Sequence, residues 1–202
     1  MLGLIGAAAI QLGPEMLPAI ERAKLTREIL ASDPEPQLPV PVIGVRRQRL
    51  RDTWGAPRSQ GRQHQGIDIV APRGRPVVST TRGIVRSVST NRLGGQVVWV
   101  TGPGGQAHYY AHLDRYSSVK AGDIVQPGTV LGYVGDTGNA KGTTPHLHYG
   151  IYTPGSGPIN PYPFLAPTET DRATPGAAAP ARRAERKADA RISVRPRESR
   201  LR

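Results

Sequence analysis

The chain has 202 residues, which is enough for one domain with a hydrophobic core together with flanking segments. It contains no cysteine, and this excludes disulfides and thiolate ligands, so a bound metal must be held by nitrogen and oxygen atoms. The formal net charge is +12, and residues 38–167 alone carry 14 basic and 5 acidic side chains, which favours an anionic partner.

The first segment, residues 1–37, is predicted to stand apart from the domain that follows. Residues 1–10 are apolar but too short to span a bilayer, and they are either the remnant of an export or anchor segment or a frayed end. Residues 17–31 are predicted to form a helix, with Pro18 tolerated in its first turn. Residues 32–41 contain four prolines, which is typical of a linker.

The next segment, residues 38–167, is predicted to form a mainly β domain. Between residues 42 and 152, short β-like runs alternate with Gly, Asn, Asp and Pro, and no helical period of useful length interrupts them. The predicted strands are 67–70, 76–79, 83–89, 97–101, 108–113, 129–134 and 146–152. This spacing indicates an antiparallel sheet rolled into a β-sandwich or an open barrel.

The last segment, residues 168–202, is predicted to be a disordered basic tail. It consists mainly of Ala, Arg, Pro and Thr, and it has too few large apolar residues to offset the entropy lost on ordering. The tail is either a solvated flexible end or a tether to an anionic surface of the cell envelope. We expect no nucleic-acid partner, because the chain lacks a recognised nucleic-acid module and has little aromatic surface for stacking.

All five histidines fall inside the predicted β domain, at positions His64, His108, His112, His146 and His148. His64 and Asp68 are four residues apart, and an even offset in an extended chain places both side chains on one face. His146 and His148 obey the same parity, with Leu147 between them predicted to face the core. Folding that brings the two pairs together would create a site of two histidines and one aspartate.

A site with three protein ligands and a fourth position for water is what a hydrolytic zinc ion needs. Such chemistry also requires a general base, and every glutamate of the chain lies outside residues 38–167. The base must therefore be a histidine or one of the few aspartates of the domain. The obvious choices are His112 and whichever of His146 and His148 is not a ligand.

Two further features are expected to play other parts. His108 belongs to no motif and is predicted to be an ordinary strand residue near the site. Residues 135–142 are rich in glycine, but no helix start follows them, so they are predicted to form a wall of the substrate groove rather than a phosphate cradle.

Three motifs together resemble a known family in their order and spacing. They are His64-Gln-Gly-Ile-Asp68, Tyr110-Ala-His112-Leu113 and Pro145-His146-Leu-His148-Tyr149. They are similar to the motifs of the lysostaphin-type (LytM, M23) metallopeptidases, and the similarity extends from about Pro39 to Leu165. It includes the run from Leu50 to Pro57, before the first motif, and the run from Val119 to Gly128, before the last strands.

The resemblance implies a fold, a cofactor and an activity. It implies a β domain of the duplicated hybrid motif type that binds zinc through His64, Asp68 and His148. His112 and His146 are then expected to polarise water and to steady the tetrahedral intermediate. Family members cut peptide bonds in the stems or cross-bridges of peptidoglycan, so the expected protein is a zinc endopeptidase of the cell envelope, periplasmic or exported.

Two alternatives remain open. Some relatives have lost metal ligands and act as noncatalytic, LytM-like activators of cell wall amidases, although all five motif positions are intact here. Residues 119–134 also resemble the hairpin of biotinyl or lipoyl carrier domains, which are β binding modules. A carrier needs an exposed lysine at a hairpin tip and has no use for five histidines. Zinc content distinguishes the carrier, and cleavage of purified cell wall distinguishes the activator.

Overall fold

The computed structural model describes residues 16–168 of the chain. The predictions of an export or anchor remnant at residues 1–10 and of a disordered tail beyond residue 168 concern segments outside these described residues. The described residues as far as Ala166 belong to one compact unit. They contain two α-helices, α1 (Met16–Ala31) and α2 (Tyr162–Leu165), and neither is long and apolar enough to cross a membrane.

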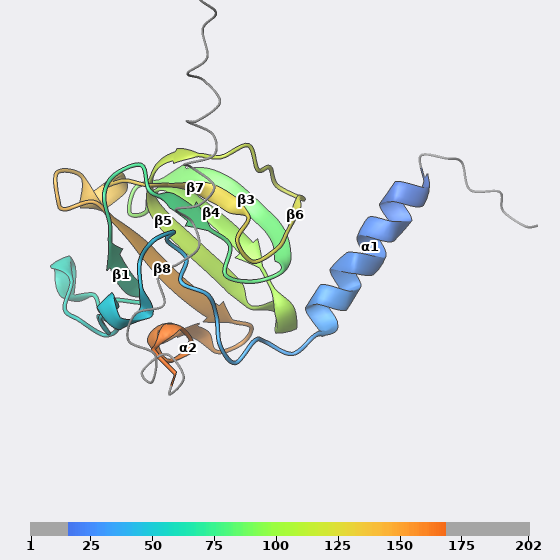
Figure 1. The fold of residues 1–202 in the computed structure, drawn as a ribbon, viewed down its shortest axis with the longest axis horizontal. Helices are drawn as coiled ribbons and strands as arrows, with labels where there is room; N and C mark the ends of the chain where they lie inside the picture. Colours follow the sequence, from blue (N-terminus) through green and yellow to red (C-terminus); the bar gives the residue numbers. More distant parts are fainter. Residues whose placement is uncertain (1–15, 169–202) are drawn as a thin grey trace, which may run out of the picture. The chain divides into compact units, whose positions relative to one another are not determined.

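The described part of the chain is dominated by one antiparallel sheet (Figure 1). Its strands are β1 (Ile67–Val70), β2 (Pro76–Val78), β3 (Gly83–Asn91), β4 (Gly95–Thr101), β5 (Ala107–Tyr116), β6 (Ile124–Val125), β7 (Val130–Val134), β8 (His146–Thr153) and β9 (Gly157–Ile159). Neighbouring strands follow the order β1-β8-β5-β4-β3-β6, while β7 pairs with both β2 and β5, and β9 pairs with β8. The prediction of a mainly antiparallel β domain is confirmed.

Strand β5 has a special place because it changes partner along its length. It pairs with β8 as far as Ala111 and with β7 from Leu113 onward, while β4 lies along its other edge. Residue 112, at the change of partner, is therefore held between two parts of the sheet, and this residue is one of the predicted site histidines.

The core lies on one face of the central strands, and alternation along β1 and at the start of β8 determines which of their side chains reach it. In β1, Ile67 and Ile69 are buried, whereas Asp68 between them is only partly covered. In β8, Leu147 is fully buried between two partly exposed histidines, as predicted. Burying Val, Leu and Ile side chains in this way stabilises the fold by about 1.5–3 kcal/mol for each fully covered residue. The ligand candidates therefore occupy the opposite face because their neighbours occupy the core.

The seven strands predicted from the sequence are all present, and so is the N-terminal helix. The two short strands β6 and β9 and the one-turn helix α2 were not predicted. With only two or three residues, β6 and β9 are too short to display an alternating pattern, so pairing with β3 and with β8 defines them instead.

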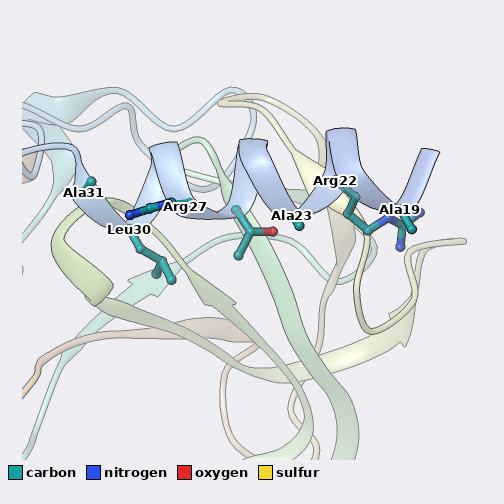
Figure 2. Close-up of a pocket in the computed structure, with 7 residues that line it drawn as sticks. Ala19, Arg22, Ala23, Arg27, Leu30 and Ala31 are labelled. Atoms are coloured by element: carbon teal, nitrogen blue, oxygen red, sulfur yellow. The ribbon is translucent and has the colours of Figure 1, made fainter. Parts of the chain in front are cut away.

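Helix α1 contacts the sheet domain along one side and leaves another face open. Ile29 is buried, the guanidinium of Arg22 donates to the carbonyl of Gly122 at 3.3 Å, and Glu28 lies 3.9 Å from Arg82. The open face carries a shallow hollow of about 700 Å³, and Figure 2 shows that its residues lie along one side of the helix. The hollow is lined by Ala19, Arg22, Ala23, Thr26, Arg27, Leu30 and Ala31.

Candidate metal centre

The pairing of β1 with β8 places two of the predicted ligands directly opposite each other. Asp68 in β1 is the register partner of His148 in β8, and Val70 is the partner of His146. His64 precedes β1 and reaches the same place from the incoming loop. The site is therefore built at an edge of the sheet where register decides which side chains meet.

Three donor atoms converge there. The Nε2 atom of His64 lies 2.8 Å from Nδ1 of His148 and 3.1 Å from Oδ1 of Asp68. The Nδ1 atom of His148 lies 3.2 Å from Oδ1 of Asp68. A tetrahedral zinc ion with bonds of about 2.0–2.1 Å separates its ligand atoms by about 3.3 Å. Among the described residues, these three form the group of His, Cys, Asp or Glu side chains arranged to hold a metal. The donor set and its spacing fit zinc.

Thr53 holds two of these three residues in place. The Nδ1–H group of His64 donates to the Thr53 carbonyl at 2.7 Å, which turns Nε2 of the same ring toward His148 and Asp68. The Oγ1 atom of Thr53 accepts a hydrogen bond from the backbone N–H of Asp68 at 3.0 Å. One residue in the loop before β1 thus fixes both the ring orientation of His64 and the backbone at Asp68.

The protonation states of Asp68 and His148 suit a cation. Burial opposes ionisation of Asp68, but hydrogen bonds with His148 and His64 outweigh it and hold the pKa of this carboxyl well below its ordinary value. Burial lowers the pKa of His148, although its hydrogen bond with Asp68 acts in the opposite direction. At neutral pH Asp68 is therefore a carboxylate and His148 is favoured as a neutral imidazole, and these are the forms that coordinate metals.

The other two motif histidines lie beside this group. The ring centroids of His112 and His146 are 5.0 Å apart, and Nε2 of His146 lies 3.9 Å from Oδ1 of Asp68. Each ring donates its Nδ1–H group to a backbone carbonyl at 2.8 Å, that of Thr137 for His112 and that of Thr144 for His146. These hydrogen bonds orient both rings so that Nε2 points away from the carbonyl. Burial lowers the pKa of His112 to about 4, despite its hydrogen bond to Thr137, so this imidazole is neutral at neutral pH.

The backbone at His112 explains how its side chain comes to the site. Strict alternation along β5 would place His112 on the same side as Tyr110, which is fully buried in the core. His112 instead has a φ of 62°, in the left-handed region, and its N–H group donates to the carbonyl of Gly94 at 2.7 Å. This irregularity turns the side chain toward the groove, as bulges beside active sites often do.

A groove of about 930 Å³ runs over the site. Its lining includes all four histidines of the site together with Asp68, and Asn139 and Ala140 contribute from the glycine-rich segment predicted to be a groove wall. An aromatic cluster forms another part of the lining, where Trp99 lies 4.3 Å from Tyr109 and 5.2 Å from Tyr152 between ring centroids. The groove therefore carries both polar and aromatic surface.

His108 lies in the core and not in the site. Its side chain is 1% exposed, and its Nδ1 atom is 2.8 Å from the hydroxyl of Tyr149 and 3.3 Å from that of Thr80. Burial lowers the pKa of His108 to about 4, so the ring is neutral at neutral pH. The sequence prediction for this residue, an ordinary strand position, agrees with its placement.

Two residues that support the site were not singled out from the sequence. Thr53 lies in the run from Leu50 to Pro57, whose similarity to the family was the only available signal. Arg58 follows that run directly, and its guanidinium forms an ion pair with Oδ2 of Asp68. No periodicity marks either position, since both lie in irregular structure.

Comparison with known proteins defines the class to which this fold and site belong. The profile of Peptidase family M23 matches residues 62–161. The L-Ala–D-Glu endopeptidase of Bacillus subtilis is 41% identical over 126 residues, which cover 57% of this chain and 39% of that protein. The structure of LytU is 34% identical, with a TM-score of 0.50, and the match covers 57% of this chain and 83% of that one.

The catalytic domain of lysostaphin from Staphylococcus simulans also matches, with a TM-score of 0.53 and 26% identity over 59% of this chain and 94% of that domain. The fold and the His, Asp, His group are those of a metallopeptidase domain. The chain belongs to peptidase family M23. It spans about two-fifths of the length of the Bacillus relative, so the match concerns a domain of that protein.

Proposed function

We propose that this protein is a zinc metallo-endopeptidase that hydrolyses peptide bonds in the stems or cross-bridges of peptidoglycan. The observation that carries the proposal is the meeting of three donor atoms within 3.2 Å of one another, beside two histidines that are oriented by Nδ1–H hydrogen bonds in the same groove. The Bacillus relative is by name an L-Ala–D-Glu endopeptidase, and lysostaphin is described as an antimicrobial peptidase.

In this proposal His64, Asp68 and His148 hold the zinc ion. A zinc ion so held lowers the pKa of a bound water to about 7 and polarises a peptide carbonyl. The hydrogen bond from His64 to Thr53 orients one ligand ring in advance, and burial, which lowers the pKa of His148, favours the neutral form of the other. This preparation reduces the reorganisation required when the ion binds.

His112 and His146 supply the proton transfers. Each ring is oriented by its Nδ1–H hydrogen bond and presents Nε2 to the groove, so each can accept a proton or, once protonated, donate one. Because burial disfavours the charged form of His112, a proton accepted there is readily passed on to the leaving amine or to the developing oxyanion.

The charge of the domain and the groove is consistent with an anionic cell wall substrate. Residues 38–167 carry 14 basic and 5 acidic side chains, and Arg58 and Arg62 both line the groove. Since peptidoglycan lies outside the cytoplasmic membrane, the proposal places the protein in the cell envelope.

The test is digestion of defined peptidoglycan fragments by zinc-loaded protein, with the products identified by mass. His148→Ala should remove zinc and activity together. His146→Ala should retain zinc but lower turnover about 100-fold or more, as expected for lost acid-base catalysis. Full activity in a zinc-free His148→Ala protein would contradict the proposal, and zinc binding without any cleavage would favour a noncatalytic activator.

A further inference from the structure

The two carboxylate oxygens of Asp68 have different partners. Oδ1 faces the ligand atoms of His64 and His148, at 3.1 Å and 3.2 Å, while Oδ2 forms an ion pair with the guanidinium of Arg58. A carboxylate can bind a metal through one oxygen or through both. Which of these happens decides how many coordination positions remain for water and substrate.

We propose that Arg58 is a positioning residue that engages Oδ2 of Asp68 and thereby limits this carboxylate to one coordinating oxygen. The inference rests on the proposed function, in which Asp68 is a metal ligand. A second coordinating oxygen would occupy the position that a hydrolytic site keeps open. Arginine suits this part because its planar, permanently charged guanidinium forms strong, directional hydrogen bonds with a carboxylate.

The loop that carries Arg58 is built to hold it in place. The backbone N–H of Arg58 donates to the carbonyl of Arg62 at 2.8 Å, and a bridge joins Pro57 to Gln63 across the same turn. Gln60 adopts a φ of 63° in this turn, a conformation that lets the chain reverse tightly. The turn therefore fixes the start of the Arg58 side chain beside β1.

The exposure of Arg58 makes it suitable for substitution. Its side chain is 36% exposed and lines the groove, so its removal opens no cavity in the core. Arg62 provides a matched control in the same loop and groove, because its guanidinium donates to the carbonyl and hydroxyl of Ser59 at 3.2 Å and 3.1 Å. Removing the charge at Arg62 changes the local field without touching Asp68.

The experiment compares zinc dissociation constants of the wild type, Arg58→Gln and Arg62→Gln, measured by competition with a chromophoric chelator. Arg58→Gln should change the zinc dissociation constant about 10- to 100-fold, because Asp68 loses the partner that orients it and can coordinate through both oxygens, whereas Arg62→Gln should not change it. In the same proteins loaded with Co²⁺, visible absorption should be weaker in Arg58→Gln alone, because a second carboxylate oxygen raises the coordination number and lowers the band intensity.

The outcomes separate this inference from the proposed function. A wild type that does not bind zinc would overturn the proposed function. A wild type that binds zinc while Arg58→Gln matches it in zinc affinity, or in the Co²⁺ spectrum, would overturn the role of Arg58. A raised KM of Arg58→Gln for anionic peptides, with unchanged zinc affinity, would also overturn the role of Arg58. Arg58 would then contact the substrate and not position Asp68.

Discussion

Replacing His108 with asparagine should change the way in which the stability of this domain depends on pH. The His108 side chain is 1% exposed, and burial lowers its pKa from the ordinary 6.5 to about 4. In the unfolded chain the imidazole regains its ordinary pKa, so between pH 6.5 and 4 the unfolded protein binds a proton that the folded protein does not. The stability linked to His108 is therefore fully present above pH 6.5 and is lost as the pH falls toward 4.

The size of the effect follows from the pKa difference. At about 1.4 kcal/mol per pKa unit, a fall from 6.5 to about 4 corresponds to about 3 kcal/mol of unfolding free energy. This is a large part of the stability of an ordinary domain, which is about 5–15 kcal/mol. The asparagine side chain would not titrate, and its amide could still meet the hydroxyl of Tyr149, which lies 2.8 Å from Nδ1 of the native ring.

The assay is urea denaturation of the wild type and His108→Asn at several pH values from neutral to about 4.5, with the free energy extrapolated to water. Other histidines, including His112, titrate in both proteins, so the difference between the two curves isolates the contribution of His108. The wild type should lose stability relative to the variant as the pH falls. Two curves that stay parallel through this window would refute the reasoning.

Three other substitutions test the supports of the site. Because the backbone φ of His112 is 62°, the His112→Gly variant should be more stable to urea than His112→Ala by about 1 kcal/mol. This order is the reverse of the usual one in a strand, and both variants should lose activity. Equal stability of the two variants would contradict a left-handed backbone at this residue. Thr53→Val should lower the free energy of unfolding by about 1–3 kcal/mol and weaken zinc binding, because the backbone N–H of Asp68 loses its acceptor. Thr53→Ser keeps the hydroxyl and should retain wild-type stability in urea denaturation and wild-type affinity in zinc titration. Gly66→Ala should lower zinc affinity and reduce the free energy of unfolding by about 1–3 kcal/mol, because a Cβ at this position would lie 2.7 Å from the His148 ring and 2.5 Å from a backbone carbonyl. A fully stable variant with wild-type zinc affinity would argue against this packing.

The sequence predicts which side chains of a strand face the site only where the alternation along that strand is regular. Ile67 and Ile69 in β1 and Leu147 in β8 alternate with polar residues, so parity alone predicts which side of the sheet each side chain takes. The register of Asp68 opposite His148 could not be derived in this way, because pairing depends on how the whole core packs.

His112 shows where alternation fails. Parity along β5 groups it with Tyr110 in the core. Its role in the site was predicted instead from the absence of a glutamate base in residues 38–167 and from the family resemblance. The left-handed backbone that redirects its side chain arises where β5 exchanges β8 for β7, a feature of the assembled sheet. Arg58 and Thr53 were missed for a related reason, because their contacts to Asp68 span 10 and 15 residues of irregular chain.

Three histidines of the site share one hydrogen-bonding arrangement but differ in position. His64, His112 and His146 each donate Nδ1–H to a threonine carbonyl, at 2.7, 2.8 and 2.8 Å, and so turn Nε2 away from that carbonyl. Nε2 of His64 lies 3.1 Å from Oδ1 of Asp68 and 2.8 Å from Nδ1 of His148, whereas Nε2 of His146 lies 3.9 Å from the same Asp68 oxygen. The same hydrogen-bonding arrangement therefore serves both proposed tasks, and the position of the ring distinguishes the proposed ligand from the proposed proton carrier. The hydrogen bonds to Thr53 and Thr144 set those positions, which is why the supporting threonines matter as much to the proposed chemistry as the rings they hold.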